Sequence, residues 1–259
     1  MKSLYLSLFA IVLPFANASA ALVYDFESLA TDVFRTGATN NISGWQQNTS
    51  NPTIGEDEFP LGYIGIDGSN HVGTLGTHFT SLNPFSSTTS LTGSLTSTGA
   101  TLNNTQVTLD LALLTFNGTT PHDAFSLTIG ADGFASAASL SFTPDAINEA
   151  WLVSYDINGS TGTNVFSWNA GISYALAFDF YDSATFISIG GSVIGSTTST
   201  FGNATLENII VSHLETPGPG VSDNVITFDN ISVTAIPEPS IAALGAIGSL
   251  ALLRRRRQG

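Results

Sequence analysis

The middle of the chain consists of short segments in which apolar residues alternate with polar or small ones. In residues 107–113 every odd position is Val or Leu, and a similar period of two recurs at 125–129, 151–155 and 172–180. Successive side chains of a β-strand point to opposite faces, so this period gives each segment one apolar face. The alternation therefore predicts strands that are buried mainly on one side.

Turn-forming sequences such as NGTTPHD and DINGSTGTN separate these segments. In the second, Asp156, Asn158 and Ser160 resemble alternate calcium ligands, but the closing acid is missing, so a hairpin turn is favoured. Only TPDAINEA, from Thr143 to Ala150, favours a helix, because threonine caps helices and proline suits their first turn. Many short strands with polar turns indicate an all-β, jelly-roll-like β-sandwich.

The charge of the chain is strongly acidic and unevenly placed. It has 20 Asp and Glu against 6 Lys and Arg, and five of the six basic residues lie at the extreme ends. Such a surface repels phosphate backbones, which excludes nucleic-acid binding, but it tolerates divalent cations and neutral sugars. The chain has no cysteine, so a disulfide framework is excluded and stability must come from the core or from a metal.

The first 20 residues have the layout of a secretory signal peptide. Lys2 is followed by an apolar stretch from Leu4 to Phe15 and by the small-residue site Ala18-Ser19-Ala20. We expect cleavage after Ala20, which leaves residues 21–235 as the β-sandwich domain of an exported protein.

The last 24 residues, 236–259, form a second targeting segment. Pro237, Glu238 and Pro239 precede 14 uncharged residues, which as a helix would measure about 21 Å. This length is short for a hydrocarbon core of about 30 Å, but arginine side chains can extend toward the interface. The four residues Arg254, Arg255, Arg256 and Arg257 then act as a stop that stays cytoplasmic. The pattern predicts a short transmembrane helix that holds the body outside the inner membrane.

The order of these three parts closely resembles the PEP-CTERM sorting signal of Gram-negative bacteria. The resemblance rests on Pro237-Glu238-Pro239, the Gly/Ala/Leu stretch and the terminal arginines. It implies that an exosortase, a membrane protease-transpeptidase, processes the exported chain at or near the three-residue motif. It also implies a final place at the cell surface or in an extracellular matrix, beside exopolysaccharide and biofilm systems.

The two ends of the body carry acids next to apolar residues. The body starts LVYDFESL and finishes VITFDNISVT. In the final segment Ile226 and Phe228 have one parity and Ile231 and Val233 the other, so a regular strand cannot bury both pairs. We therefore expect a β-bulge at Asp229-Asn230. Terminal strands commonly pair in jelly rolls, which would bring Asp229 near Asp25 or Glu27.

These end segments also resemble carbohydrate-binding-module and concanavalin-like jelly rolls of secreted proteins. The resemblance implies a structural calcium ion that joins the two terminal strands, with Glu27 and Asp229 as ligands and Asp25 as a further one. Calcium takes several oxygen ligands, and the body offers many. The alternative is that these carboxylates are simply solvated at strand edges.

No catalytic residues are assigned, because the sequence has no zinc-protease motif and no nucleophile elbow. Trp151 and Trp168 stand in alternating segments and are expected in the core, whereas Trp45, in the loop ISGWQQNTS, is the candidate platform for a sugar ring. Three functions stay open: a non-catalytic structural or adhesive surface protein, a glycan-binding module, and a polysaccharide-cleaving enzyme. The first is favoured, with exosortase, the export machinery, the inner membrane and extracellular polysaccharide as partners.

Overall fold

The structure is a computed structural model, and it describes residues 21–27, 44–49, 61–67, 70–76, 88–115, 120–214 and 224–236. The predicted signal peptide at 1–20, the motif Pro237-Glu238-Pro239, and the arginines 254–257 lie outside the described residues. Within the described ranges no helix is long and apolar enough to cross a membrane.

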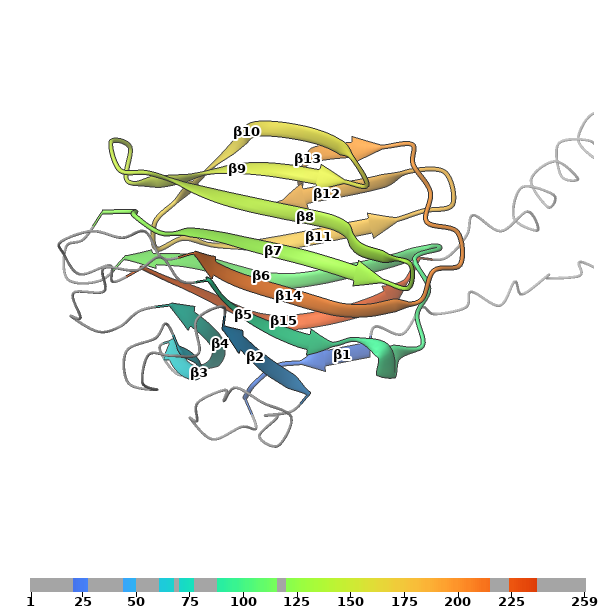
Figure 1. The fold of residues 1–259 in the computed structure, drawn as a ribbon, viewed down its shortest axis with the longest axis horizontal. Coiled ribbons are helices and arrows are strands. Elements are labelled where there is room, and N and C mark those ends of the chain that lie inside the picture. The colour runs from blue at the N-terminus through green and yellow to red at the C-terminus, as the bar shows by residue number, and fades with distance from the viewer. Residues whose placement is uncertain are drawn as a thin grey trace, which may run out of the picture.

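The strands form two antiparallel sheets that pack face to face as a β-sandwich (Figure 1). Sheet A has eight strands: β13 (Ser192–Thr197), β12 (Thr185–Ile189), β11 (Ser173–Phe180), β6 (Thr105–Thr115), β15 (Asn224–Ala235), β4 (Asn70–Gly76) and β3 (Leu61–Asp67) in spatial order, with β1 (Ala21–Tyr24) also paired to β15. Sheet B has seven strands, in the order β10 (Ser160–Asn169), β9 (Ala150–Ile157), β8 (Phe134–Asp145), β7 (Ala124–Ala131), β14 (Leu206–Leu214), β5 (Thr88–Ser94) and β2 (Trp45–Thr49). This arrangement confirms the all-β sandwich.

The apolar faces of the two sheets meet in one continuous core. In β6 the odd residues from Val107 to Leu113 are buried, while Thr108 and Asp110 are part-exposed on the other side. Trp151 and Trp168 are fully buried, which confirms their place in the core. Burial of each such side chain is worth about 1.5–3 kcal/mol, so the period of two is what holds the sandwich together.

Two local predictions differ from the structure. The helix expected from Thr143 to Ala150 is wrong, because β8 continues to Asp145 and β9 begins at Ala150. The Asp145 side chain accepts hydrogen bonds from the backbone N–H groups of Ile147 and Asn148, each at 3.2 Å, and so closes a tight turn instead of a helix. Ile172 precedes β11 and is 46% exposed, because the chain is still turning there.

The hairpin expected between β9 and β10 is confirmed. Asn158 and Gly159 both have positive φ, at 48° and 86°, as a two-residue turn between twisted strands requires. The Asp156 carboxylate accepts the backbone N–H of Gly159 at 2.7 Å. The acid of this turn is thus used to fix the hairpin.

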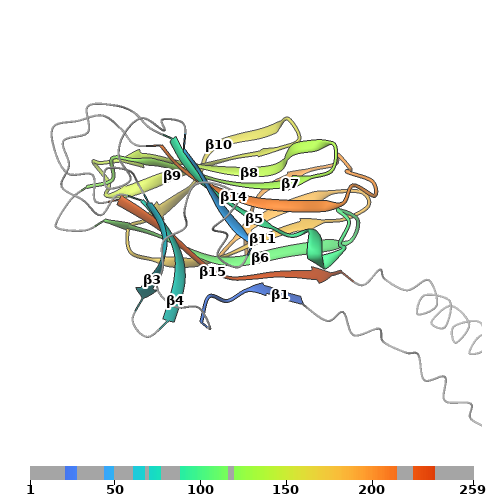
Figure 2. The same ribbon diagram turned by 60° about the horizontal axis from the view of Figure 1, so that its bottom comes forward.

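The first and last strands of the domain lie side by side, as expected for a jelly-roll-like fold. β1 pairs antiparallel with β15, with Ala21 opposite Val233 and Tyr24 opposite Ile231 (Figure 2). The pairing places residues 25–27, which follow β1, near the middle of β15. This junction positions the candidate site.

Candidate functional site

The site begins with an irregularity in β15. Ile226 and Phe228 point into the core before it, and Ile231 and Val233 point into the core after it. The pairing with β6 shifts between Asp229 and Ser232, where Asn230 has a φ of 53°. The predicted β-bulge at Asp229-Asn230 is therefore confirmed. Its consequence is that Asp229 and the exposed Asn230 are presented together on the outer face of sheet A.

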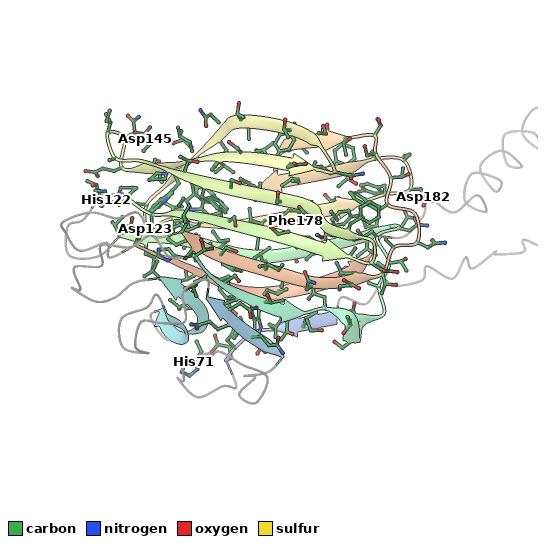
Figure 3. The ribbon with its side chains drawn as sticks, in the orientation of Figure 1. His71, His122, Asp123, Asp145, Phe178 and Asp182 are labelled. Atoms are coloured by element: carbon green, nitrogen blue, oxygen red, sulfur yellow. The ribbon has the colours of Figure 1, made fainter. Side chains whose placement is uncertain are left out.

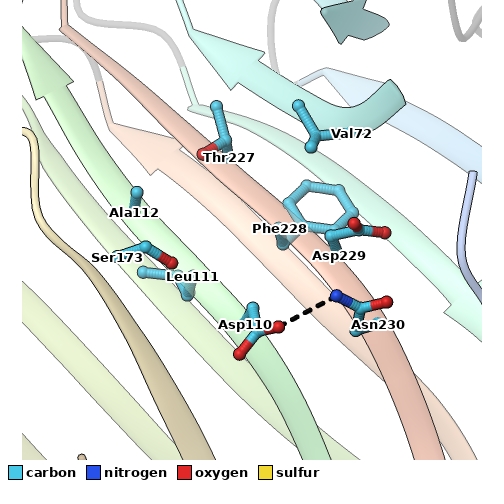
Figure 4. A pocket seen from close by; sticks show the side chains of 9 residues that line it. All are labelled: Val72, Asp110, Leu111, Ala112, Ser173, Thr227, Phe228, Asp229 and Asn230. Atoms are coloured by element: carbon cyan, nitrogen blue, oxygen red, sulfur yellow. Dashed lines mark hydrogen bonds between the residues drawn. The ribbon is translucent and has the colours of Figure 1, made fainter. Parts of the chain in front are cut away.

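A second acid stands directly opposite on the neighbouring strand. Asp110 of β6 is the register partner of Asp229, and both lie on the outer face. The side-chain amide of Asn230 donates to Asp110 Oδ2 at 2.9 Å (Figure 4). The side chain of Asn230 in the bulge thus donates a hydrogen bond to the Asp110 carboxylate and not to that of Asp229.

Asp229 is the unusual member of the pair. Asp229 is only 7% exposed, and its Oδ1 is buried with no hydrogen-bond partner in the described part of the chain. The pKa of Asp229 is raised from 3.8 to about 6, chiefly because burial disfavours the charged carboxylate. The negative charges of Glu27, Asp110 and Asp25 contribute to this rise, while the backbone N–H of Asn230 opposes it. A buried oxygen without a partner, among other acids, is a position that a cation would stabilise.

The turn after β1 brings two of those acids to the site. Phe26 has a φ of 53° and is buried, with its ring centroid 5.8 Å from that of Phe228. Because Phe26 points inward, Asp25 and Glu27 on either side of it remain part-exposed or exposed. The backbone carbonyl of Glu27 also lies 3.3 Å from His71 Nδ1. An aromatic anchor therefore sets the acidic segment beside the bulge.

We name Asp25, Glu27, Asp110 and Asp229 the acidic cluster. Among the described residues, no three His, Cys, Asp or Glu side chains converge tightly enough to hold a metal ion by themselves. The unpartnered Asp229 Oδ1 fits a cation, and Ca²⁺ also accepts backbone carbonyls, amide oxygens and water as ligands. The donor set is entirely oxygen, which suits Ca²⁺ better than a softer metal.

Two adjoining depressions hollow the outer face of sheet A beside the acidic cluster. Their volumes are about 120 and 330 Å³, and both are bordered by Asp110 and Asn230. The larger reaches the low end of the usual range for small-molecule sites. The hollow exists because the outward residues nearby are small: Thr108, Ala112, Ser173, Ala175, Ala177 and Ser188. We call the two depressions together the sheet A groove.

The structure corrects the assignment of Trp45 as a sugar platform. Trp45 belongs to β2 and not to a loop, and it is fully buried. Its ring packs 4.9 Å from Phe228 and over Gly93, where a Cβ would lie only 2.7 Å from the indole. An indole enclosed in this way cannot stack on a sugar. The loop prediction failed because β2 is short and polar on its outer side, so it carries a weak strand signal.

Sequence reasoning missed Asp110, Asn230 as its partner, and the groove. Asp110 is the single acid within the alternating segment 107–113, so its outward direction was readable. What was not readable is that β6 pairs with β15, since period and parity do not give strand order.

No protein-family model matches the chain, and no curated protein matches it. Solved structures do resemble it. A sialidase chain has a TM-score of 0.51 at 13% identity, over 85% of this chain and 19% of the sialidase, so the present chain spans about a fifth of it. A non-specific endo-β-1,3(4)-glucanase from family GH16 has a TM-score of 0.49 at 12% identity, over 84% and 92%. The CBM2 module of an evolved Dit protein from Lactobacillus casei BL23 phage J-1 has a TM-score of 0.48 at 16% identity, over 86% of this chain and 99% of the module. At 13% identity the likeness to the sialidase chain is one of fold alone.

Proposed function

We propose that the chain is an exported surface or matrix protein whose β-sandwich is a non-catalytic structural or adhesive module stabilised by calcium. Its destination is supported by the sequence of the C-terminal segment, in which Pro237-Glu238-Pro239, an apolar stretch and Arg254–Arg257 follow one another. The export machinery removes residues 1–20, and the segment 236–259 holds the body at the inner membrane of a Gram-negative-type cell. Exosortase then processes the segment near the motif and releases residues 21–235 to the surface or matrix.

Mass spectrometry of the protein recovered from the cell surface tests this route. The expected species begins at Ala21 and lacks the apolar stretch and the arginines. Replacing Arg254–Arg257 by serine should leave the body exported but unprocessed or misplaced, because the stop is lost. A chain that keeps both ends and stays in the cytoplasm would contradict the proposal.

The single observation that supports calcium is the buried, unpartnered Asp229 Oδ1 beside three other carboxylates. In this proposal Asp229, Glu27 and Asp25 hold the ion, and backbone or amide oxygens and water complete its coordination. The ion would neutralise the acidic cluster and fasten the segment after β1 to β15. Its role is structural, since it closes the sheet at the point where the two ends of the domain meet.

Thermal unfolding in Ca²⁺ and in chelator tests the metal site. At a calcium concentration 100 times Kd the free energy of unfolding should rise by about 2.7 kcal/mol, or about 5–10 °C in Tm. Asp229→Asn and Glu27→Gln should each remove most of this shift, whereas Glu149→Gln, an exposed acid in the β8–β9 turn, should keep it. An equal shift in Asp229→Asn would show that calcium binds elsewhere, and no shift in the unaltered chain would leave the cluster as solvated carboxylates.

The groove supports glycan binding as a second candidate function. A hollow of about 330 Å³ with carboxylate and amide groups at its border offers both space and hydrogen-bonding groups for a sugar. Calorimetric titration with soluble oligosaccharides tests it. Ala177→Gln fills the hollow and should weaken binding at least tenfold, whereas Ser196→Gln, on exposed β13, should not change it. Equal affinities for the two variants would remove the groove as the binding site.

The non-catalytic part of the proposal is tested separately. Glycoside hydrolysis needs two carboxyl groups that flank the bond to be cleaved. Asp110 and Asp229 instead stand side by side on adjacent strands, and Asn230 binds one of them. We expect no new reducing ends when the chain is incubated with polysaccharides. Release of reducing ends that Asp110→Asn abolishes would replace this proposal by a polysaccharide-cleaving enzyme.

A further inference from the structure

The outer face of sheet B carries serines aligned in a straight row across five strands. The strand registers pair Ser90 with Ser212, Ser212 with Ser126, Ser126 with Ser141 and Ser141 with Ser154. We call these five residues the serine row. It runs from β5 through β14, β7 and β8 to β9, and Asn48 of β2 extends it beyond Ser90. Strands lie about 4.8 Å apart, so the five serines span about 19 Å.

A parallel row lies two residues away along the strands. It consists of Gln46, Thr92, Ile210, Thr128, Ser139 and Asp156, again in direct register. Two residues of strand separate the rows by about 6.7 Å. Since the residues between the rows point into the core, the two rows form a regular grid on the outer face.

The serine row is free to bind something outside the molecule. All five serines are part-exposed or exposed, while the inward neighbours Leu91, Leu127 and Leu140 are fully buried. Within the described residues only Ser154 of the row has a side-chain hydrogen bond, as acceptor from the backbone N–H of Asn164 at 3.1 Å. Each remaining hydroxyl can donate one hydrogen bond and accept others.

The near absence of charge in the two rows indicates what kind of ligand they can bind. The chain has a formal net charge of −14, yet the only charged residue in the two rows is Asp156, at one end. An acidic protein with one neutral face repels polyanions and presents only hydrogen bonds to an uncharged partner. The rows contain no aromatic side chain, so no single contact is strong. A ligand must therefore engage many hydroxyls in sequence, which requires an extended polymer with a repeating pattern of hydroxyl groups.

We propose that the outer face of sheet B binds an extended, uncharged polysaccharide that lies along the serine row, across the strands. The inference rests on the proposed destination outside the cell, where such polymers occur, and it gives the adhesive role a partner. It involves a surface on the opposite sheet from the acidic cluster and the groove.

Co-sedimentation of the full-length chain with insoluble polysaccharides tests the proposal. The neutral probes are microcrystalline cellulose and an insoluble β-1,3-glucan, and cross-linked alginate is the charged probe. We expect retention on at least one neutral polymer and none on alginate. The double variant Ser126→Glu/Ser141→Glu places two charges in the row, which a neutral ligand would have to desolvate, and should lower the bound fraction at least tenfold. Ser196→Glu, which places one such charge on exposed β13 of sheet A, should leave the bound fraction unchanged.

A second variant guards against misfolding. Ser126→Ala/Ser212→Ala removes two hydroxyls but keeps the face flat, and should weaken retention about threefold with unchanged circular dichroism. No retention on either neutral polymer, or retention equal in the charged double variant and in Ser196→Glu, would overturn the inference. Dimerisation that the charged variant abolishes would also overturn it, because the face would then bind a second copy. The assay uses purified protein, so its failure leaves the export and calcium proposals untouched, and their failure leaves its result unchanged.

Discussion

The two outer faces of the sandwich are built from the same alternating strands but have opposite characters. The outer face of sheet A is hollowed and acidic, and its hydroxyls and amides bind neighbouring side chains, as Thr108 does Ser232 at 2.7 Å. The outer face of sheet B is regular and nearly neutral, with serines aligned in one row. The difference comes largely from the bulge in β15, which turns two polar residues outward and draws in the segment after β1. One irregular residue in β15 is enough to gather acidic side chains at one point, whereas the regular pairing of sheet B spreads its polar side chains evenly over the face.

Each sheet also has a buried acid: Asp229 on sheet A has an oxygen without a partner among the described residues, whereas Asp123 beside sheet B faces a histidine. Loss of the Asp123 side chain should have the largest effect on stability. Asp123, before β7, is fully buried, and its carboxylate lies 3.0 Å from the equally buried His213 Nε2 of sheet B. Figure 3 shows Asp123 beside His122 at one end of the sandwich, away from Asp182. Asp123→Ala should lower the free energy of unfolding by about 3–5 kcal/mol, because it leaves a buried polar partner behind. Urea denaturation measures this, and a loss below about 1 kcal/mol would mean that the pair is not structural.

When calcium is absent, the charged Asp229 carboxylate should destabilise the folded state, whereas the Asp123 carboxylate stabilises it. Since its pKa is about 6 in the folded chain and 3.8 ordinarily, the folded state holds a proton that the unfolded state has released between these values. This contribution to stability is fully present below about pH 4 and is lost as the pH rises through 6, by about 1–3 kcal/mol.

Denaturation in chelator at pH 4.5 and 7.5 measures this contribution. Asp229→Asn, which cannot ionise, should lose less stability than the unaltered chain between these pH values. The difference in free energy of unfolding between the two proteins should therefore favour the variant most at pH 7.5. The same pH dependence in both proteins would show that another group is responsible. With calcium present the sign should reverse, because the ion favours the ionised carboxylate.

The smallest effects compare hydroxyls on the two faces. Thr108→Ala on sheet A breaks the hydrogen bond with Ser232 and should cost about 1 kcal/mol. Ser126→Ala on sheet B breaks none among the described residues and should stay within about 0.5 kcal/mol. Chemical denaturation of both variants checks the difference. Equal costs would indicate that the serine row is used to stabilise the sheet itself.

Much of the fold could be read from the chain before the structure, and the limits are physical. Period two identified the strands around Val107, Phe125, Trp151 and Phe178, because each buries one face only. Opposite parity in one segment located the bulge, since no regular strand can bury both sets. Strand order depends on contacts between distant segments, so the approach of Asp110 to Asp229 and the alignment of the serine row were beyond reach. Trp45 was misplaced for a related reason, because its burial depends on Gly93 across the sheet.

The place of β15 has a consequence for how the chain matures. Although β15 is the final strand of the domain, it lies inside sheet A, between β6 and β4, and it also carries β1. A chain that emerges from its N-terminus can complete neither sheet A nor the contact between its first and last strands until β15 is present. Such non-local closure is slow and comes late. If the chain is exported as proposed, sheet A can be completed only after residue 235 has crossed the membrane.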